Sequence, residues 1–106
     1  MTVAIPTVLV GTGFKGAAAK SAIALMRPGD AVQLVREPNN KFDPLAVACH
    51  YRGLHVGYIP RQANQAIARA LDAGRELTCT VREPPVVYGP VVRVEPKLTV
   101  SWESDR

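Results

Sequence analysis

An aromatic side chain and a carboxylate stand next to each other in the segment LVREPNNKFDPLAV, residues 34–47. They are Phe42 and Asp43, and the prolines and asparagines around them already provide what a loop needs. Two interpretations follow. In the first, which the residues alone favour, Phe42 packs beneath its loop and Asp43 caps the turn made by Asn39 and Asn40. In the second, the ring and the carboxylate face solvent and bind a ligand.

The charge of the chain is a mild basic excess. Its 106 residues include 13 Lys and Arg against 9 Asp and Glu, which gives a formal net charge of +4. Such an excess favours polyanions without requiring them, and ordinary solubility is the simpler explanation. Six basic residues fall at the expected ends of elements or on the polar face of a helix: Arg36, Lys41, Arg52, Arg61, Arg69 and Arg75.

The acidic and nucleophilic residues show no pattern of a catalytic site. Metal-dependent nuclease chemistry needs clustered carboxylates, and the acids here form no paired motif. Ser21 and Ser101 have no histidine at a recognisable spacing, and His50 and His55 fall on expected hairpin strands. We therefore expect a protein that is not an enzyme and that uses no cofactor.

The two cysteines, Cys49 and Cys79, lie in segments that alternate like strands, and neither belongs to a Cys-x-x-Cys pair. A zinc site made of these cysteines with His50 and His55 is the alternative. Adjacent strand residues point to opposite faces, so Cys49 and His50 could not easily share one ion. We expect two buried, unreactive cysteines and no metal.

The sequence GTGFKG, residues 11–16, predicts a glycine-rich loop that carries one aromatic side chain, Phe14. It lacks the terminal Gly-Lys-Ser/Thr of a P-loop and the full spacing of a dinucleotide-binding loop. It is therefore not interpreted as a nucleotide-phosphate loop.

Alternating apolar residues, interrupted by Gly and Pro, predict six short strands, and Pro60 and Gly74 mark the start and stop of one amphipathic helix. Ala-rich residues 17–26 form a short helical turn, and residues 83–90 an irregular Pro-rich loop. Arg52 and Gly53 are expected to turn one hairpin, and Pro96 to kink the last strand. The expected strands cover residues 3–10, 31–36, 44–51, 54–59, 76–82 and 91–102.

These elements predict a mainly β fold of the α+β class with one or two helices. Short strands of this kind favour a small, closed or nearly closed six-stranded barrel, OB-like or SH3-like, with a helix after the fourth strand. The length predicts a single domain, residues 1–106. No apolar run approaches the roughly 20 residues of a membrane helix, and no export signal is seen, so we expect a cytoplasmic protein without a membrane partner.

A family resemblance is carried by LVREPNNKFDPLAVACHYRGLHVGYIPRQANQAIARALDAG, residues 34–74. It resembles the HIRAN domain, in which an apolar strand leads to Arg-Glu-Pro-x-Asn, then an aromatic followed by Asp, then Ala-Ile/Val, Gly-Tyr-Ile/Leu-Pro and an Ala-rich helix. The glycine-rich loop matches more loosely. Members occur fused to DNA-repair helicases and nucleases and as free-standing bacterial proteins.

The resemblance implies an OB-like barrel that captures the free 3′-hydroxyl end of single-stranded DNA. In characterised members the aromatic residue holds the terminal base and the following Asp accepts a hydrogen bond from the 3′-hydroxyl; these positions are Phe42 and Asp43 here. Phe14 would form the opposite wall. Gly13 stands where a characterised member has a phosphate-binding arginine, and Lys15 is expected to supply that charge.

The resemblance therefore implies a non-catalytic DNA-binding module that acts in DNA repair or replication-fork processing, with a helicase or nuclease as a further partner. A protein-interaction module that binds a peptide or partner chain in the same groove is the alternative. The sequence does not indicate the oligomeric state. The expected DNA-binding residues are Phe14, Lys15, Arg36, Lys41, Phe42, Asp43, Tyr58 and Arg61.

Overall fold

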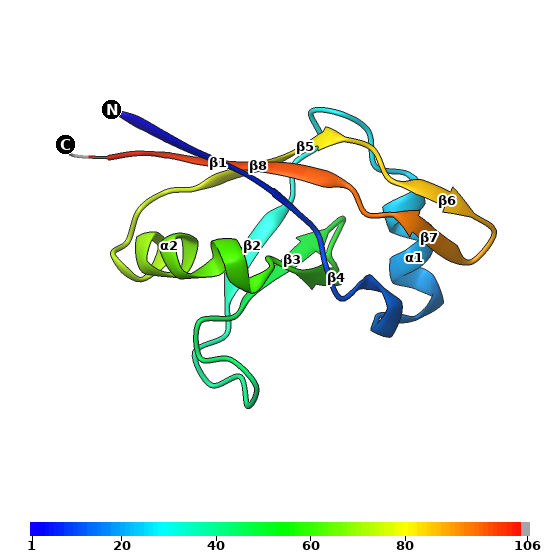
Figure 1. Ribbon diagram of the computed structural model, residues 1–106, viewed down its shortest axis with the longest axis horizontal. Coiled ribbons are helices and arrows are strands. Elements are labelled where there is room, and N and C mark those ends of the chain that lie inside the picture. The colour runs from blue at the N-terminus through cyan, green and yellow to red at the C-terminus, as the bar shows by residue number, and fades with distance from the viewer. Residues whose placement is uncertain (105–106) are drawn as a thin grey trace.

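The first sheet joins strands from both ends of the chain with one from its second half. Its order is β1–β8–β5, all antiparallel, with β1 at Thr2–Val8, β8 at Lys97–Glu103 and β5 at Thr78–Glu83. Figure 1 shows β1 and β8 side by side, so that the two chain ends lie together. The computed structural model describes residues 1–104, and of Phe14 only the backbone.

The second sheet is an antiparallel meander of order β2–β3–β4, with β2 at Gln33–Arg36, β3 at Val47–Tyr51 and β4 at Leu54–Tyr58. Arg52 and Gly53 turn the β3–β4 hairpin with φ angles of 53° and 80°. Two consecutive positive φ angles match the right-handed twist of the flanking strands. The structure thus confirms the hairpin that this dipeptide predicts.

Two isolated bridges connect the sheets at both edges. Val10, just beyond β1, pairs with Tyr58 of β4, and Ala31, just before β2, pairs with Thr80 of β5. The strands therefore surround one core, but the ladders do not run continuously around a barrel. The mainly β fold with two helices is confirmed. The prediction of six strands is wrong, because the described residues form eight.

Two helices contact the second sheet, one at β4 and the other at β2 and β3. A 3₁₀ turn, η1 (Thr12–Phe14), leads into α1 (Gly16–Ala24), and Pro60 precedes α2 (Arg61–Asp72), which follows β4 as predicted. Ile67 and Ala68 are buried on the inner face of α2. No helix in the described part of the chain is long and apolar enough to span a membrane.

The small hairpin of β6 (Val86–Tyr88) and β7 (Val91–Val94) corrects the sequence prediction in two places. Residues 83–90 are not an irregular loop, and residues 91–102 are not one kinked strand. The chain leaves the hairpin at Pro96, which has no N–H to continue a ladder, and its carbonyl accepts instead from the amide of Leu9 at 3.1 Å. The strands β7 and β8 therefore belong to different sheets.

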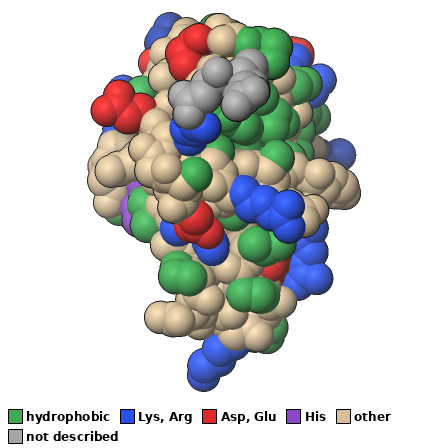
Figure 2. Space-filling model, turned by 90° about the vertical axis from the view of Figure 1, so that its left-hand side faces the viewer, with side chains coloured by type: hydrophobic (Ala, Val, Ile, Leu, Met, Phe, Trp, Pro, Cys, Tyr) green, Lys and Arg blue, Asp and Glu red, His purple; other side chains and the backbone are tan. Residues whose placement is uncertain are grey.

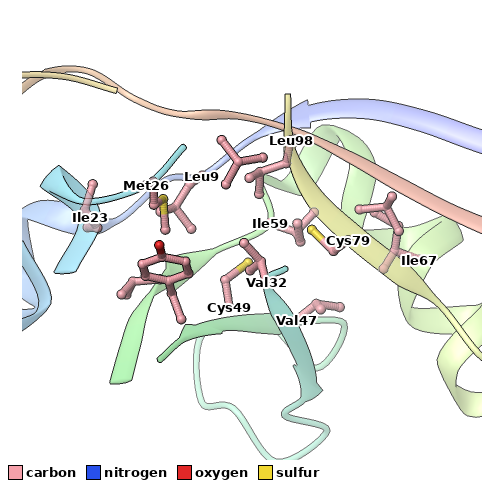
Figure 3. Packing of buried hydrophobic residues seen from close by; sticks show 14 of the residues in the cluster. Leu9, Ile23, Met26, Val32, Val47, Cys49, Ile59, Ile67, Cys79 and Leu98 are labelled. Atoms are coloured by element: carbon pink, nitrogen blue, oxygen red, sulfur yellow. The ribbon is translucent and has the colours of Figure 1, made fainter. Parts of the chain in front are cut away.

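The hydrophobic core lies between the two three-stranded sheets. Figure 3 shows Val32 and Cys49 on one side of it and Cys79 and Leu98 on the other, with Ile67 reaching in from α2. Both cysteines are free and buried, as predicted. Burial raises the pKa of both thiols, that of Cys79 to about 12, which makes them poor nucleophiles at neutral pH.

Candidate nucleic-acid interface

A pocket of about 420 Å³ opens where the β2–β3 loop (residues 37–46) meets the end of β4 and the first turn of α2. The start of α1 closes its opposite side. The pocket brings together five of the eight residues predicted to bind DNA: Lys15, Phe42, Asp43, Tyr58 and Arg61. The other lining residues are Val10, Asn40, Ala46, Ile59, Pro60 and Asn64.

The β2–β3 loop is held by its own polar side chains. The carboxamide oxygen of Asn40 accepts from the backbone amides of Phe42 and Asp43 at 2.9 and 3.1 Å, while its nitrogen donates to Glu37 at 2.9 Å. Asparagine can replace backbone partners in this way, which satisfies a turn without a sheet ladder. The loop forms the lowest part of the molecule in Figure 1, and Figure 2 shows apolar and basic side chains on it.

Phe42 is exposed over 86% of its surface, although it lines the pocket. Its backbone is fixed on both sides, because its amide donates to Asn40 and its carbonyl accepts from Nη2 of Arg61 at 2.9 Å. The interpretation that Phe42 fills the core is therefore wrong. The ring stands at the pocket rim, where a flat ligand could stack on it.

The carboxylate of Asp43 is both a brace of its loop and a wall of the pocket. Oδ1 accepts from the amide of Leu45 at 2.9 Å, Oδ2 accepts from Nδ2 of Asn64 at 2.8 Å, and Nε of Arg61 lies 3.6 Å from Oδ2. These contacts hold the pKa of Asp43 below its usual value, the Leu45 amide most and Asn64 next. Asp43 is therefore ionised at neutral pH. Because a carboxylate has about four acceptor positions, it can still accept a hydrogen bond from a ligand.

Tyr58 forms the floor of the pocket. Its hydroxyl donates to Oε1 of Glu37 at 2.9 Å, Nζ of Lys15 lies 4.8 Å from its ring centre, and His55 packs edge-on against it at 4.9 Å. Burial and the bond to Glu37 raise the pKa of Tyr58. Burial opposes ionisation of Glu37, but hydrogen bonds from Asn40 and Tyr58 outweigh it and lower its pKa. Tyr58 thus remains a donor and Glu37 an acceptor.

Gly57 allows the chain just beyond β1 to lie close to Tyr58 at the pocket floor. A Cβ atom at Gly57 would lie 2.4 Å from the carbonyl oxygen of Val10 and 2.9 Å from Cδ1 of Leu9. Only glycine lets the end of the first strand approach β4 so closely, and there Val10 and Tyr58 exchange two backbone hydrogen bonds of 2.8 and 2.9 Å. Glycine is therefore required before Tyr58 because of how the two strands pack at the pocket floor.

Two predicted DNA-binding residues, Arg36 and Lys41, lie outside the pocket lining. Arg36 directs two nitrogens at the carboxylate of Asp72, at 2.9 and 3.1 Å, and a third at the carbonyl of Ala46 at 2.9 Å, which ties β2 to the end of α2. Lys41 is exposed on the β2–β3 loop outside the pocket lining. The side chain of Phe14 lies outside the described residues.

Sequence reasoning missed two asparagines that organise the pocket, Asn40 and Asn64. Asn64 is 4% exposed, and it contacts Asp43 from the inner side of α2. A polar residue three positions before Ile67, on the face of the helix that the apolar residues bury, is the signal that could have identified it.

The residues considered for a zinc site do not form one. His50 and His55 stack with ring centres 5.0 Å apart and an angle of 5° between their planes, and Cys49 is buried in the core. No group of three or more His, Cys, Asp or Glu in the described part of the chain is placed to hold a metal ion. Burial first, then Lys15, lowers the pKa of His55, which favours its neutral form.

A family model and a solved structure point to the same family. The family model of the HIRAN domain matches residues 5–102. The crystal structure of the HIRAN domain of human HLTF is similar with a TM-score of 0.71 and 19% identity, over 95% of this chain and 78% of that chain. The crystal structure of a protein from Lactobacillus plantarum is similar with a TM-score of 0.71 and 25% identity, over 97% and 98%. No curated protein gives a significant match. The chain belongs to the HIRAN domain family.

Proposed function

We propose that this chain is a non-catalytic module that binds single-stranded DNA and holds the nucleotide with the free 3′-hydroxyl in the pocket beside Phe42. The HIRAN domain is a nucleic-acid-binding domain, and family membership supports the general role. The observation that carries the proposal is the exposed Phe42 ring on the rim of a pocket whose wall is the ionised carboxylate of Asp43.

The pocket has the chemistry that a terminal nucleotide requires. Phe42 offers a stacking face for the base, and such stacking contributes about 1–3 kcal/mol per base without sequence preference. A base inside a duplex is covered on both faces by its neighbours, so this contact favours unpaired bases. The Asp43 carboxylate can accept from a 3′-hydroxyl but repels a 3′-phosphate, so it distinguishes the end of a strand from its interior.

The cations at the pocket make salt-sensitive binding the expected behaviour. Lys15 and Arg61 flank the pocket, whereas Arg36 is engaged by Asp72. Each phosphate neutralised on a single strand contributes about 0.7 to the slope of log affinity against log salt, so a small interface gives a shallow slope. We place the module in DNA repair or replication-fork processing in the cytoplasm, beside a helicase or nuclease.

Fluorescence anisotropy with two otherwise identical strands, one ending in a 3′-hydroxyl and one in a 3′-phosphate, tests the proposal. The unmodified protein should prefer the hydroxyl end, and Asp43→Asn should reduce this preference about fivefold, because a neutral acceptor is weaker and repels no phosphate. Asp72→Asn is the matched control, since Asp72 pairs with Arg36 outside the pocket. Equal affinity for both ends would contradict end recognition, and no affinity for either strand would favour a peptide ligand.

A further inference from the structure

A second hollow, of about 500 Å³, lies beside η1, because Gly13 is one of its lining residues. Its walls come from the start and outer face of α1 and from the tip of the β6–β7 hairpin, and they include Gly13, Gly16, Lys20, Ser21 and Gly89. Most of these side chains are hydrogen atoms, methyl groups or a hydroxymethyl group. A ligand backbone can therefore approach the protein backbone closely here, and none of the described lining residues carries an aromatic ring.

The charge of this region favours an anion. Residues 11–29 contain three cations and no Asp or Glu. Lys20 lines the hollow and makes no ion pair or hydrogen bond within the described part of the chain. Glu95 is an acidic residue in contact with η1, and its two carboxylate oxygens both accept from the Thr12 hydroxyl at 3.1 Å. Burial raises the pKa of Glu95, which disfavours its negatively charged form. No acidic residue lines the hollow.

The hollow adjoins the pocket. Lys15 lines the pocket and Gly16 lines the hollow, and consecutive Cα atoms are about 3.8 Å apart. The residues that line the two cavities thus follow one another along the chain at this point. This segment supplies one lysine to each cavity, Lys15 to the pocket and Lys20 to the hollow.

We propose that the hollow is a second subsite for the same DNA strand, which holds the sugar–phosphate backbone of the nucleotides that precede the terminal one, with Lys20 contacting a phosphate. This inference rests on the proposed function, because the pocket must hold the 3′ end. It assigns a direction to the strand, whose 5′ side runs over the start of α1 toward the β6–β7 hairpin. It also predicts backbone contact without base preference at this subsite.

A strand with single neutral linkages tests the subsite. Oligothymidylates that end in a 3′-hydroxyl and carry one methylphosphonate at successive positions are titrated by anisotropy against the unmodified protein and Lys20→Ala. The neutral linkage near the 3′ end that faces Lys20 should weaken the unmodified protein about fivefold at about 0.1 M salt. The same linkage should not weaken Lys20→Ala further. The salt slope of Lys20→Ala should be lower by about 0.7.

Two further variants keep the result interpretable. Gly13→Glu puts a carboxylate at the edge of the hollow, and it should fold, because Gly13 has an ordinary φ and no atom lies within 4 Å of an added Cβ. It should weaken binding more than Lys20→Ala does. Lys97→Ala, a lysine that pairs with Glu83 outside both sites, should bind like the unmodified protein.

The outcomes separate the two proposals. Unmodified protein that prefers a 3′-hydroxyl, combined with a Lys20→Ala variant that responds to every neutral linkage as the unmodified protein does, would overturn the subsite and leave the pocket intact. Equal losses for Lys20→Ala and Lys97→Ala would also overturn it, since only overall charge would then matter. Absence of any DNA binding by the unmodified protein would overturn the proposed function itself.

Discussion

The β2–β3 loop and the β6–β7 hairpin (residues 84–94) both project from the body of the protein, and both contain prolines, yet they are held in opposite ways. Hydrogen bonds that involve the side chains of Asn40, Asp43, Arg61 and Asn64 fix the loop. Among the described residues, no side-chain hydrogen bond involves the hairpin. Its outer face instead exposes cross-strand apolar pairs, Val86 with Val94 and Tyr88 with Val91.

The difference teaches where a binding site is built. A polar network fixes the loop before a ligand arrives, so little ordering has to be done on binding, and Phe42 and Asp43 are presented in one geometry. The hairpin exposes several apolar side chains, but no side-chain hydrogen bond among the described residues fixes its geometry. The location of the site therefore follows from the side chains that hold the loop in place, and not from the largest apolar exposure.

Gly57 gives the largest expected effect, because the loop can be preorganised only if the pocket floor beneath it is rigid. Gly57→Ala should lower the free energy of unfolding by about 3 kcal/mol, since its Cβ forces the Val10 carbonyl away and loses the bridge to Tyr58. Urea unfolding measures this loss. Gly13→Ala, where an added Cβ meets nothing within 4 Å, is the control, and an equal loss there would contradict the packing argument.

The family motif could be recognised from the sequence, but this reason for Gly57 could not. Arg52-Gly53 predicts its turn because both residues have to adopt positive φ locally. The need for glycine at position 57 instead arises from Leu9 and Val10, almost 50 residues earlier in the chain. Periodicity and turn residues report local geometry, whereas a close approach between strands depends on the assembled fold.

Phe42 tests whether the preorganised loop carries the binding. Phe42→Ala should cost about 2 kcal/mol of affinity for single-stranded DNA, while the free energy of unfolding changes by less than about 0.5 kcal/mol because the ring is exposed. Tyr88→Ala removes an aromatic ring from the hairpin, where 67% of it is exposed, and should leave the 3′-end preference unchanged. Loss of affinity in Tyr88→Ala, with none in Phe42→Ala, would reverse the comparison.

Acid should release the loop before it affects the hairpin. The pKa values of Asp43 and Glu37 are depressed in the folded protein, so their stabilising contribution is present above their ordinary values of 3.8 and 4.5. It is lost as the pH falls through the lower, folded values. Residues 84–94 contain no acidic side chain. Below pH 4, hydrogen exchange corrected for intrinsic rates should therefore accelerate in the loop.

The same measurement has an internal control. Glu37→Gln removes one of the titrating groups and should flatten the acid dependence of exchange in the loop without changing exchange in the hairpin. The pKa of His55 is also lowered, so His55 adds to the loss of stability in acid, but in a higher pH range than the two carboxylates. This loss begins as the pH falls below 6.5, where the unfolded chain takes up the proton first. Loop and hairpin that open together at low pH would mean that the two projections are one cooperative unit.

The polar network shows why the site was only partly predictable. Phe42 and Asp43 could be singled out because they are neighbours in the sequence, and the resemblance implied the role that we propose for them. The Asn64–Asp43 contact joins residues 21 positions apart, on a helix and a loop whose relative position no local pattern determines. The hairpin was missed for the opposite reason. Its prolines indicate an irregular segment, although Val87 and Val92 pair across an antiparallel ladder, which shifts register between Val86 and Val87.

The smallest expected effect is on the outer face of the hairpin, and it decides whether this apolar surface is really uncovered. Val94 is 47% exposed, so Val94→Thr should change the free energy of unfolding by less than about 0.5 kcal/mol. Val92 faces inward and packs against the core, so Val92→Thr should cost about 1 kcal/mol through its partly buried hydroxyl. Unfolding of both variants is measured at two protein concentrations, because a surface covered by a second copy is stabilised by mass action. A cost for Val94→Thr that equals the cost for Val92→Thr and grows with concentration would mean that the hairpin is held from outside, and its contrast with the self-supporting loop would disappear.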